Sequence, residues 1–438
     1  MSTLKFTNPV HWARIERHLA EAAGERFAFA FTRTLSNSGH GPILEVADIA
    51  PIDDDDVEHD HNGCYLADQA LDRIHNHAAA TGLGLAEFHN HRTGPAAFSR
   101  TDETALAPMA EYVLDLLGGA PYVAAVWADG HIHADWWRHD AHGQTQRAAF
   151  DTLTVLGDQL RVLNAPAVVA DERFARQLPL LGQVAQAAIA SMRVAVVGAG
   201  GTGSHVALNF AYLGFRNVRV LDDDVVEVTN LNRLITAERA DLDSPKALIA
   251  RRRMRAIDPL INVTCHPALT VDGDHPELHD VDLIIGCLDH DGPRQRLNQI
   301  AVSTRTPYLD IATGVDNSTK PAALGGRVIF VLPGTPCLTC LDELDSAEIA
   351  RWAKSDTQQD LDRLHSYGTG DPNPSVIYLN GLTVNAALTE LAAWITGARR
   401  PARYIDIDLV GNSATPGIRI GPRQVKGRDP GCISCAAD

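Results

Sequence analysis

The segment Gly198-Ala-Gly-Gly-Thr-Gly203 decides how the larger part of this chain folds. It follows a β-branched run at residues 194–197 and opens a stretch with helical periodicity, so it joins a strand to a helix. Backbone amides at such a junction can surround phosphate groups. Asp222 ends the next β-branched run, where a carboxylate can accept hydrogen bonds from ribose hydroxyls. These features predict a nucleotide site that includes Asp222 and the glycines Gly198, Gly200, Gly201 and Gly203.

Short β-branched and aliphatic runs continue after this segment, and helical periods separate them. This alternation predicts an α/β fold with a doubly wound parallel sheet. Two later runs are expected to extend the sheet. The predicted strands cover residues 194–198, 218–222, 261–263, 282–285, 308–311, 325–332 and 404–409.

The length of 438 residues exceeds the roughly 250–300 residues at which a single core stops growing, so two or three domains are expected. Residues 1–140 are predicted to form a mixed α/β domain, in which Trp12, Ile15 and Leu19 share one helical face. Residues 141–170 are predicted to form a helical linker. The nucleotide-binding domain is then expected to cover residues 171–438.

The net charge of −17 repels polyanions, which argues against nucleic acid and acidic membrane surfaces as partners. Nowhere do 18 consecutive apolar residues occur, and the first residues do not have the pattern of a signal peptide. We therefore expect a cytoplasmic protein without a membrane span. The acidic residues 53–56 and the following His59-Asp-His61 are expected to form a solvated loop.

Three motifs after the glycine loop specify the nucleotide site further. They are Leu221-Asp-Asp-Asp-Val-Val-Glu-Val-Thr-Asn-Leu-Asn-Arg233, Ser244-Pro-Lys246 and Cys287-Leu-Asp289. The segment from about residue 172 to the C-terminus resembles the ubiquitin-activating and ThiF/MoeB superfamily, including HesA-type proteins. Members of this superfamily have a Rossmann-like fold and adenylate the C-terminal carboxylate of a ubiquitin-like protein.

The resemblance implies that the glycine loop binds the phosphates of ATP, Asp222 the ribose and Asp289 a Mg²⁺ ion. Arg233 and Lys246 have a chemical reason to be there, because cations offset the charge that gathers when a carboxylate attacks a phosphate. An NAD-dependent oxidoreductase would leave both cations without a role. The residues that the resemblance places at the triphosphate are Asn230, Arg233 and Lys246.

The segment Glu172-Arg-Phe-Ala-Arg-Gln177 also resembles a motif of this superfamily. In the superfamily's homodimers the second arginine reaches the ATP of the partner subunit. The resemblance therefore implies a homodimer in which Arg176 contacts the partner's nucleotide. An exposed helical arginine is the alternative.

Seven cysteines include two C-x-x-C pairs, Cys337/Cys340 and Cys432/Cys435. Four thiolates in two pairs are typical of a tetrahedral structural Zn²⁺ site. We expect this site to join the end of the chain to the strand near residue 332, with redox chemistry as the alternative. Residues 341–431 contain no cysteine that could form a thioester.

The run His89-Asn-His-Arg-Thr-Gly-Pro-Ala-Ala-Phe-Ser-Arg-Thr-Asp102 places two histidines at the end of a predicted strand. Two imidazoles and a carboxylate are three protein ligands for a catalytic Zn²⁺, which leaves a position for water. The spacing of His89, His91, Ser99 and Asp102 resembles the motif of JAB/JAMM metalloproteases, isopeptidases that act on ubiquitin-like proteins. This resemblance covers about residues 8–140.

In that family a glutamate before the first strand is the general base, and Glu25 occupies this place. Ser99 would stabilise the oxyanion of the tetrahedral intermediate. The family's proline after the second histidine is Arg92 in this chain. The alternatives are a domain that binds metal but is inactive, and histidines and a helix cap with structural roles alone.

The combined interpretation is a two-enzyme chain that adenylates the C-terminal glycine of a ubiquitin-like protein and hydrolyses its tail or its conjugates. The expected cofactors are ATP, Mg²⁺ and Zn²⁺. The expected partner ends in two glycines and belongs to a conjugation or antiviral system, with a conjugating enzyme downstream. The alternative is a sulfur-carrier adenylyltransferase that supplies a sulfurtransferase, with the first domain as a non-catalytic docking module.

Overall fold

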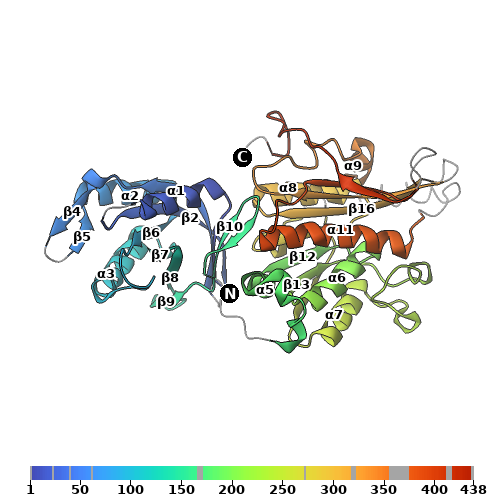
Figure 1. Ribbon diagram of the computed structural model, residues 1–438, viewed down its shortest axis with the longest axis horizontal. Coiled ribbons are helices and arrows are strands. Elements are labelled where there is room, and N and C mark those ends of the chain that lie inside the picture. The colour runs from blue at the N-terminus through green and yellow to red at the C-terminus, as the bar shows by residue number, and fades with distance from the viewer. Residues whose placement is uncertain are drawn as a thin grey trace. The chain divides into compact units, whose positions relative to one another are not determined.

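The computed structural model describes residues 2–435 apart from residues 22–23, 39–40, 61–62, 165–170, 271–272, 317–321, 355–373 and 411–416. The chain forms two compact units, Met1–Ala167 and Val168–Asp438. Each unit is built on its own large sheet (Figure 1).

The first unit contains a nine-stranded sheet in the order β11-β10-β1-β3-β2-β6-β7-β8-β9. A separate two-stranded sheet joins β4 to β5. The strands are β1 (Thr3–Phe6), β2 (Phe27–Ser38), β3 (Gly41–Pro51), β4 (Val57–Asp60), β5 (Gly63–Leu66), β6 (Gly84–Asn90), β7 (Tyr122–Ala128), β8 (His131–His139), β9 (Thr145–Ala149), β10 (Thr152–Leu156) and β11 (Leu160–Val162).

Helices pack on both faces of this sheet. Trp12, Ile15 and Leu19 of α1 (Pro9–Ala20) are buried in one core cluster, as the helical spacing predicts. The opposite face carries a second cluster that includes side chains of α2 (Asp68–Thr81) and α3 (Arg100–Leu116). The start of α3 is fixed by a capping box between Ser99 and Asp102, so the predicted helix cap is present.

The prediction of a helical linker at residues 141–170 is wrong. Strands β9, β10 and β11 occupy this segment and belong to the sheet of the first unit. β10 pairs in parallel with β1, from Thr3 opposite Thr152 to Phe6 opposite Val155. Because its partner lies about 150 residues earlier in the sequence, local periodicity could not identify this strand.

The predicted solvated loop at residues 53–61 is also partly wrong. A single 3₁₀ turn at Asp54–Asp56 is followed directly by β4, which pairs with β5. Residue 61 lies outside the described residues.

The second unit contains an eight-stranded sheet in the order β14-β13-β12-β15-β16-β17-β18-β19. The first five strands in this order run parallel, and the pairs from β16 to β19 are antiparallel. The predicted runs are all strands, and β19 is an additional one. The strands are β12 (Arg193–Val197), β13 (Asn217–Leu221), β14 (Asn262–His266), β15 (Leu283–Gly286), β16 (Tyr308–Asp316), β17 (Ala323–Val331), β18 (Tyr404–Asp408) and β19 (Arg419–Pro422).

Helices cover both faces of this sheet (Figure 1). α6 contacts β12, α7 contacts β13 and β14, and α11 contacts β16 and β17. α8 packs beside the cysteine pairs in a cluster on the other face. The helices are α4 (Leu178–Leu181), α5 (Gln183–Ser191), α6 (Gly201–Leu213), α7 (Lys246–Ile257), α8 (Asp291–Ser303), α9 (Ser346–Trp352) and α11 (Ile377–Thr396). The parallel sheet with crossover helices confirms the predicted doubly wound α/β fold.

Candidate functional site

A cavity of about 380 Å³ lies at the carboxyl-terminal ends of the parallel strands. Ligands of open α/β sheets bind at this edge. Most of the residues predicted for the nucleotide site line the cavity, although they come from separate strands and loops. These are Gly198, Gly200, Gly201, Asp222, Arg233, Lys246 and Asp289.

The glycine loop needs its glycines because the backbone approaches its neighbours closely. Gly198 has φ +90°, and a Cβ on it would lie 2.5 Å from the carbonyl oxygen of Cys287. A Cβ on Gly203 would lie 1.9 Å from the carbonyl oxygen of Gly198. Gly203 therefore allows the helix start to pack against the Gly198 carbonyl, whereas Gly198, Gly200 and Gly201 line the cavity.

Asp222 supports this loop directly. Its Oδ2 accepts a hydrogen bond from the Ala199 N–H at 2.6 Å, and its Oδ1 accepts one from the Asp224 N–H at 3.0 Å. Burial raises the pKa of the Asp222 carboxyl above its ordinary value, although the hydrogen bond from Ala199 opposes this shift. Both carboxylate oxygens of Asp222 thus have backbone partners within the protein.

Asp224 provides a more accessible carboxylate in the same cavity. Its side chain is 70% exposed, and its Oδ2 lies 2.7 Å from Lys246 Nζ. Lys246 begins α7 and is only 11% exposed, so its ammonium group is directed along the cavity wall. Asp224 is not among the residues predicted from the sequence, although it belongs to the run of three aspartates that begins with Asp222.

Asn230 does not line the cavity. Its side chain is buried, and Oδ1 accepts a hydrogen bond from the Glu227 N–H at 3.2 Å, which caps a 3₁₀ turn. This turn positions Arg233, whose guanidinium donates to the Thr229 carbonyl at 2.8 Å. Arg176 is exposed just before α4 and also lies outside the cavity.

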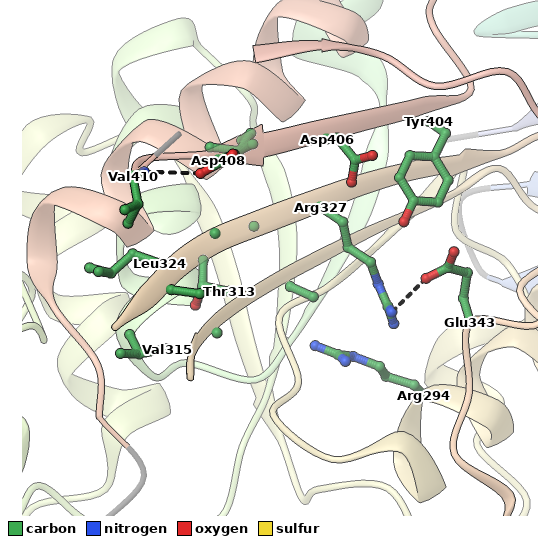
Figure 2. Close-up of a pocket in the computed structure, with 16 residues that line it drawn as sticks. Arg294, Thr313, Val315, Leu324, Arg327, Glu343, Tyr404, Asp406, Asp408 and Val410 are labelled. Carbon is green, nitrogen blue, oxygen red and sulfur yellow. Dashed lines mark hydrogen bonds and ion pairs between the residues drawn. The ribbon is translucent and has the colours of Figure 1, made fainter. Parts of the chain in front are cut away.

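A second and larger cavity of about 830 Å³ lies along β16, β17 and β18 (Figure 2). It shares Thr313, Gly314 and Val315 with the first cavity. Asn380 of α11 holds this shared wall, because its Oδ1 accepts a hydrogen bond from the Thr313 hydroxyl at 3.0 Å. The two cavities therefore have part of β16 in common.

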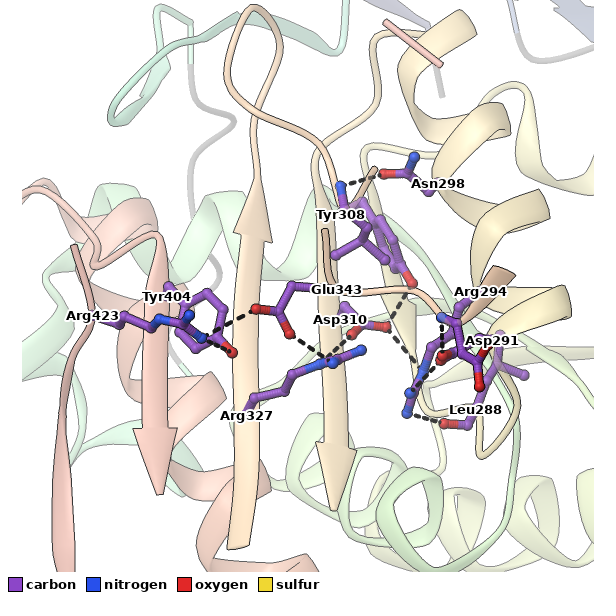
Figure 3. A network of polar contacts seen from close by, with 12 residues as sticks. Leu288, Asp291, Arg294, Asn298, Tyr308, Asp310, Arg327, Glu343, Tyr404 and Arg423 are labelled. Atoms are coloured by element: carbon purple, nitrogen blue, oxygen red, sulfur yellow. Dashed lines mark hydrogen bonds and ion pairs between the residues drawn. The ribbon is translucent and has the colours of Figure 1, made fainter. Parts of the chain in front are cut away.

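A polar network borders the second cavity (Figure 3), and its members Arg294, Arg327 and Glu343 line that cavity. Asp310 is fully buried, accepts a hydrogen bond from the Tyr308 hydroxyl at 2.8 Å and lies 3.5 Å from Arg294 Nε. Arg327 bridges Asp310 and Glu343, with Nη1 2.8 Å from the Glu343 carboxylate. The sequence does not predict this network, because its members are spread over about 50 residues and form no local motif.

The two C-x-x-C pairs come together in space. The Sγ–Sγ distances are 3.9 Å from Cys337 to Cys340, 3.7 Å from Cys337 to Cys432 and 3.3 Å from Cys340 to Cys435. A tetrahedral Zn²⁺ with bonds of about 2.3 Å requires sulfur atoms about 3.8 Å apart. The donor set and its spacing fit a structural Zn²⁺, and the cluster joins the last described residues to the end of β17 as expected.

The predicted ligands of the first unit also converge. Asp102 lies 3.6 Å from His89 Nε2 through Oδ1 and 3.2 Å from His91 Nε2 through Oδ2. Both ring nitrogens of His89 are buried and have no hydrogen-bond partner among the described residues. Burial raises the pKa of Asp102, but the nearby His89 imidazole and the hydrogen bond from the Ser99 N–H outweigh burial and hold this pKa well below its usual range. Two imidazoles and an ionised carboxylate fit Zn²⁺.

The other predicted residues of this site lie around the three ligands. Glu25 is exposed and lies two residues before β2, whose first residue Phe27 pairs with His89. The Ser99 hydroxyl accepts a hydrogen bond from the Asp102 N–H at 3.2 Å, so Ser99 caps α3 beside the ligands. His133 pairs with Asp135, with 3.0 Å between Nε2 and Oδ1.

The second unit thus has the features of a nucleotide-binding α/β protein: a glycine loop, cations and acidic side chains around one cavity. Residues 174–428 match the ThiF family model, and the chain belongs to this family. The segment is 35% identical over 141 residues to a sulfur carrier protein adenylyltransferase of Thermus thermophilus, covering 32% of this chain and 52% of that protein.

Two further relatives represent different branches. A sulfur carrier protein ThiS adenylyltransferase of Escherichia coli is 28% identical over 175 residues, and the match covers 39% of this chain and 66% of that protein. SUMO-activating enzyme subunit 2 of Dictyostelium discoideum is 27% identical over 39% of this chain and 25% of its own length. The chain therefore spans between a quarter and two thirds of these relatives.

Among solved structures, E. coli MccB with ATP matches with a TM-score of 0.46 and 20% identity over 60% of this chain and 74% of that chain. No helix within the described residues is long and apolar enough to span a membrane.

Proposed function

We propose that the second unit adenylates the C-terminal carboxylate of a partner protein. The observation that carries this proposal is the convergence of the glycine loop, Arg233, Lys246 and Asp289 on one cavity, which shares three wall residues with a second cavity. Its membership of the ThiF family supports the same activity. Relatives named as sulfur carrier adenylyltransferases and as a SUMO-activating subunit support a carboxylate of a small protein as the substrate.

The reaction forms a bond between the carboxylate oxygen and the α-phosphorus of ATP. The bond between this phosphorus and the oxygen that bridges to the β-phosphate breaks. The products are an acyl-adenylate and pyrophosphate. Arg233 and Lys246 would offset the charge on the phosphates, and Asp289 would hold Mg²⁺ with its exposed carboxylate. Lys246 must leave Asp224 to reach a phosphate, and the exposed Asp224 carboxylate is then available for a ribose hydroxyl.

The second cavity provides a route for the partner's tail. Gly314 in the shared wall has no atom within 4 Å of the position of a Cβ, so the backbone there is accessible. A chain that ends in two glycines is narrow enough to pass between this wall and the phosphates. This property favours a ubiquitin-like or sulfur-carrier protein over a free amino acid as the acyl donor.

Pyrophosphate exchange into ATP tests this proposal. Exchange should require MgATP and a diglycine-ended partner, and Asp289→Asn should reduce it by about 10²-fold or more, because a metal-bound charge at the reacting phosphate contributes several kcal/mol. Asp274→Asn is a matched control, since Asp274 is also 80% exposed but lies outside both cavities. Equal exchange by Asp289→Asn and wild type would contradict the assignment.

We also propose that the second unit acts as a homodimer. Leu180 and Val184 of α4 and α5 are 83% and 59% exposed, and Tyr212 of α6 is 62% exposed. Exposed apolar side chains of this size favour a second copy of the chain that covers them. Arg176 would then contact the nucleotide bound to that second copy. Mixing Arg176→Ala chains with Asp289→Asn chains tests this proposal. In a mixed dimer one nucleotide site has Asp289 from its own chain and Arg176 from the partner, so adenylation activity should return.

We propose zinc-dependent peptide hydrolysis as the activity of the first unit. The convergence of His89, His91 and Asp102 carries this proposal. A bound Zn²⁺ would supply an activated water. Glu25 would accept the proton of that water and Ser99 would donate to the oxyanion. Cleavage of a partner extended beyond its diglycine should fall in Glu25→Gln without loss of zinc, and unchanged cleavage would exclude Glu25 as the base.

The alternative for the first unit is a docking module without catalysis. Zinc stoichiometry and cleavage together separate the two: two zinc ions per chain with cleavage support the hydrolase, and one zinc ion without cleavage supports the docking module. Supplying a sulfurtransferase and a conjugating enzyme in turn would show which of the two accepts the acyl group of the adenylate.

A further inference from the structure

We infer that Arg147 is a positioning residue that holds the zinc ligand Asp102 in place; this inference rests on the proposed zinc site of the first unit. Arg147 lies on the edge strand β9, whereas Asp102 lies in the first turn of α3. Among the described residues, the hydrogen bonds of Arg147 go to Glu103 and Asp135 and not to Asp102. The connection runs through Glu103, the residue that follows the ligand.

The guanidinium of Arg147 binds Glu103 through both terminal nitrogens, with Nη2 2.8 Å from Oε1 and Nη1 2.5 Å from Oε2. Its Nε donates to Asp135 Oδ2 at 2.7 Å. A bidentate arginine–carboxylate pair fixes direction as well as distance. Arg147 therefore ties the helical turn that carries Asp102 to the sheet at β8 and β9.

Ring contacts strengthen the same connection. Arg147 stacks over Trp137 at 4.8 Å and over Phe98 at 5.5 Å from the ring centres. The Phe98 ring lies 6.4 Å from the His89 ring and 5.3 Å from the His133 ring. Because Phe98 directly precedes the Ser99 cap, Arg147 contacts the chain on both sides of the ligand-bearing turn.

The charges around Arg147 explain why its loss would move this turn. Asp102, Glu103 and Asp135 bring three carboxylates close together, and they repel one another when ionised. Asp135 has a side chain that is 9% exposed and depends on Arg147 and His133 for compensation. Without Arg147, Glu103 and Asp135 would separate, and the first turn of α3 would shift with them.

The test compares Arg147→Met with Arg161→Met in the full-length chain. Arg161 makes the same kind of bidentate pair, to Glu16 at 2.8 and 3.0 Å, but it joins β11 to α1 at the other end of the sheet. Zinc affinity is measured by titration against a competing chelator, and stability by thermal unfolding of the same samples. Arg147→Met should weaken the weaker of the two zinc sites by about 10- to 100-fold, the usual range for residues that support ligands. Arg161→Met should lower the melting temperature without changing zinc affinity.

Glu103→Gln is a second variant that keeps Arg147 stacked on Phe98 and guards against a folding defect. It should weaken the same zinc site, and the Co²⁺-substituted protein should show an altered absorption spectrum. Wild-type zinc affinity in both Arg147→Met and Glu103→Gln, with a lower melting temperature, would overturn the inference. A wild-type chain that binds zinc only at its cysteines would overturn the proposed zinc site as well, so the two failures can be distinguished.

Discussion

Asp222 and Asp224 lie two residues apart at the end of β13, yet their carboxylates have different partners. Asp222 binds two backbone N–H groups of the nucleotide loop region, and Asp224 binds Lys246. The sequence motif suggests a ribose contact for the first aspartate. Each Asp222 oxygen can still accept a further hydrogen bond, so its ribose contact stays a prediction, and the more exposed Asp224 is a second candidate carboxylate for the ligand.

Asp224→Ala should therefore weaken ATP binding about tenfold or more, because a hydrogen bond to a charged group contributes about 1.5–3 kcal/mol. Its melting temperature without ATP should stay close to that of wild type. Asp222→Ala should lower the melting temperature, because the Ala199 N–H loses its acceptor. Calorimetric titration with a non-hydrolysable ATP analogue and thermal unfolding measure both quantities. Equal ATP affinity in Asp224→Ala and wild type would contradict the assignment.

Cys287 lies at the bottom of the nucleotide cavity, and burial raises its pKa to about 12. A thiol with this pKa is protonated at neutral pH and a poor nucleophile. We predict that iodoacetamide leaves Cys287 unmodified in the native protein at pH 7.5 and alkylates it after unfolding in denaturant. Peptide mass spectrometry identifies the modified residue. Rapid native alkylation would reopen the possibility of a thioester at this position.

At the scale of elements, the four-cysteine cluster connects β17 to the end of the chain. Cys337 and Cys432 are buried in the same core cluster as α8. Burial raises the pKa of the Cys340 thiol, but backbone hydrogen bonds at Asp429 and Cys337 and contacts with the neighbouring thiols outweigh burial and lower it. This environment favours a thiolate at Cys340, whereas burial raises the pKa of Cys432 and Cys435, whose protons a bound Zn²⁺ would displace.

Loss of this metal should unfold the cluster and loosen the network at Glu343. We predict that Cys432→Ser lowers the melting temperature by about 5 °C or more, since each kcal/mol corresponds to about 2–4 °C in a domain of this size. Cys265→Ser is the control, because Cys265 lies on β14 away from the cluster. Differential scanning calorimetry with zinc analysis measures the effect. An unchanged melting temperature after loss of one zinc ion would exclude a structural role.

Contiguous motifs made the candidate sites of both units predictable. The glycine loop, the cysteine pairs and the H-x-H run each place several functional atoms within a few residues, and most of the predicted residues lie at three sites. Strand β10 and the network around Asp310 depend on partners that are far apart in the sequence. The sequence contains no local signal for such pairings. The phosphate contact of Asn230 stays a prediction, because a buried cap and a phosphate ligand require the same amide side chain and the sequence alone does not separate them.

At the scale of the whole molecule, the chain combines two proposed activities that act on the same kind of substrate. One unit would expose a diglycine carboxylate by hydrolysis, and the other would activate it. Tethering raises the effective concentration of the product of one unit at the other. This arrangement predicts that a tail-extended partner supports pyrophosphate exchange only in a chain with an active first unit.

Glu25→Gln should consequently abolish exchange with the extended partner and leave exchange with the mature diglycine partner unchanged. The matched comparison uses Glu16→Gln, whose carboxylate pairs with Arg161 away from the zinc ligands. Equal exchange with both partners in Glu25→Gln would show that the first unit is not needed for maturation.

The central claim is that the cavity of the second unit transfers AMP to a protein carboxylate. Intact-mass spectrometry of a diglycine-ended partner after incubation with the chain and MgATP tests it most directly. We predict a partner that carries one AMP on its C-terminal carboxylate, released by hydroxylamine and absent when the last glycine is deleted. ATP binding without any AMP adduct on a partner that the chain binds would contradict the claim.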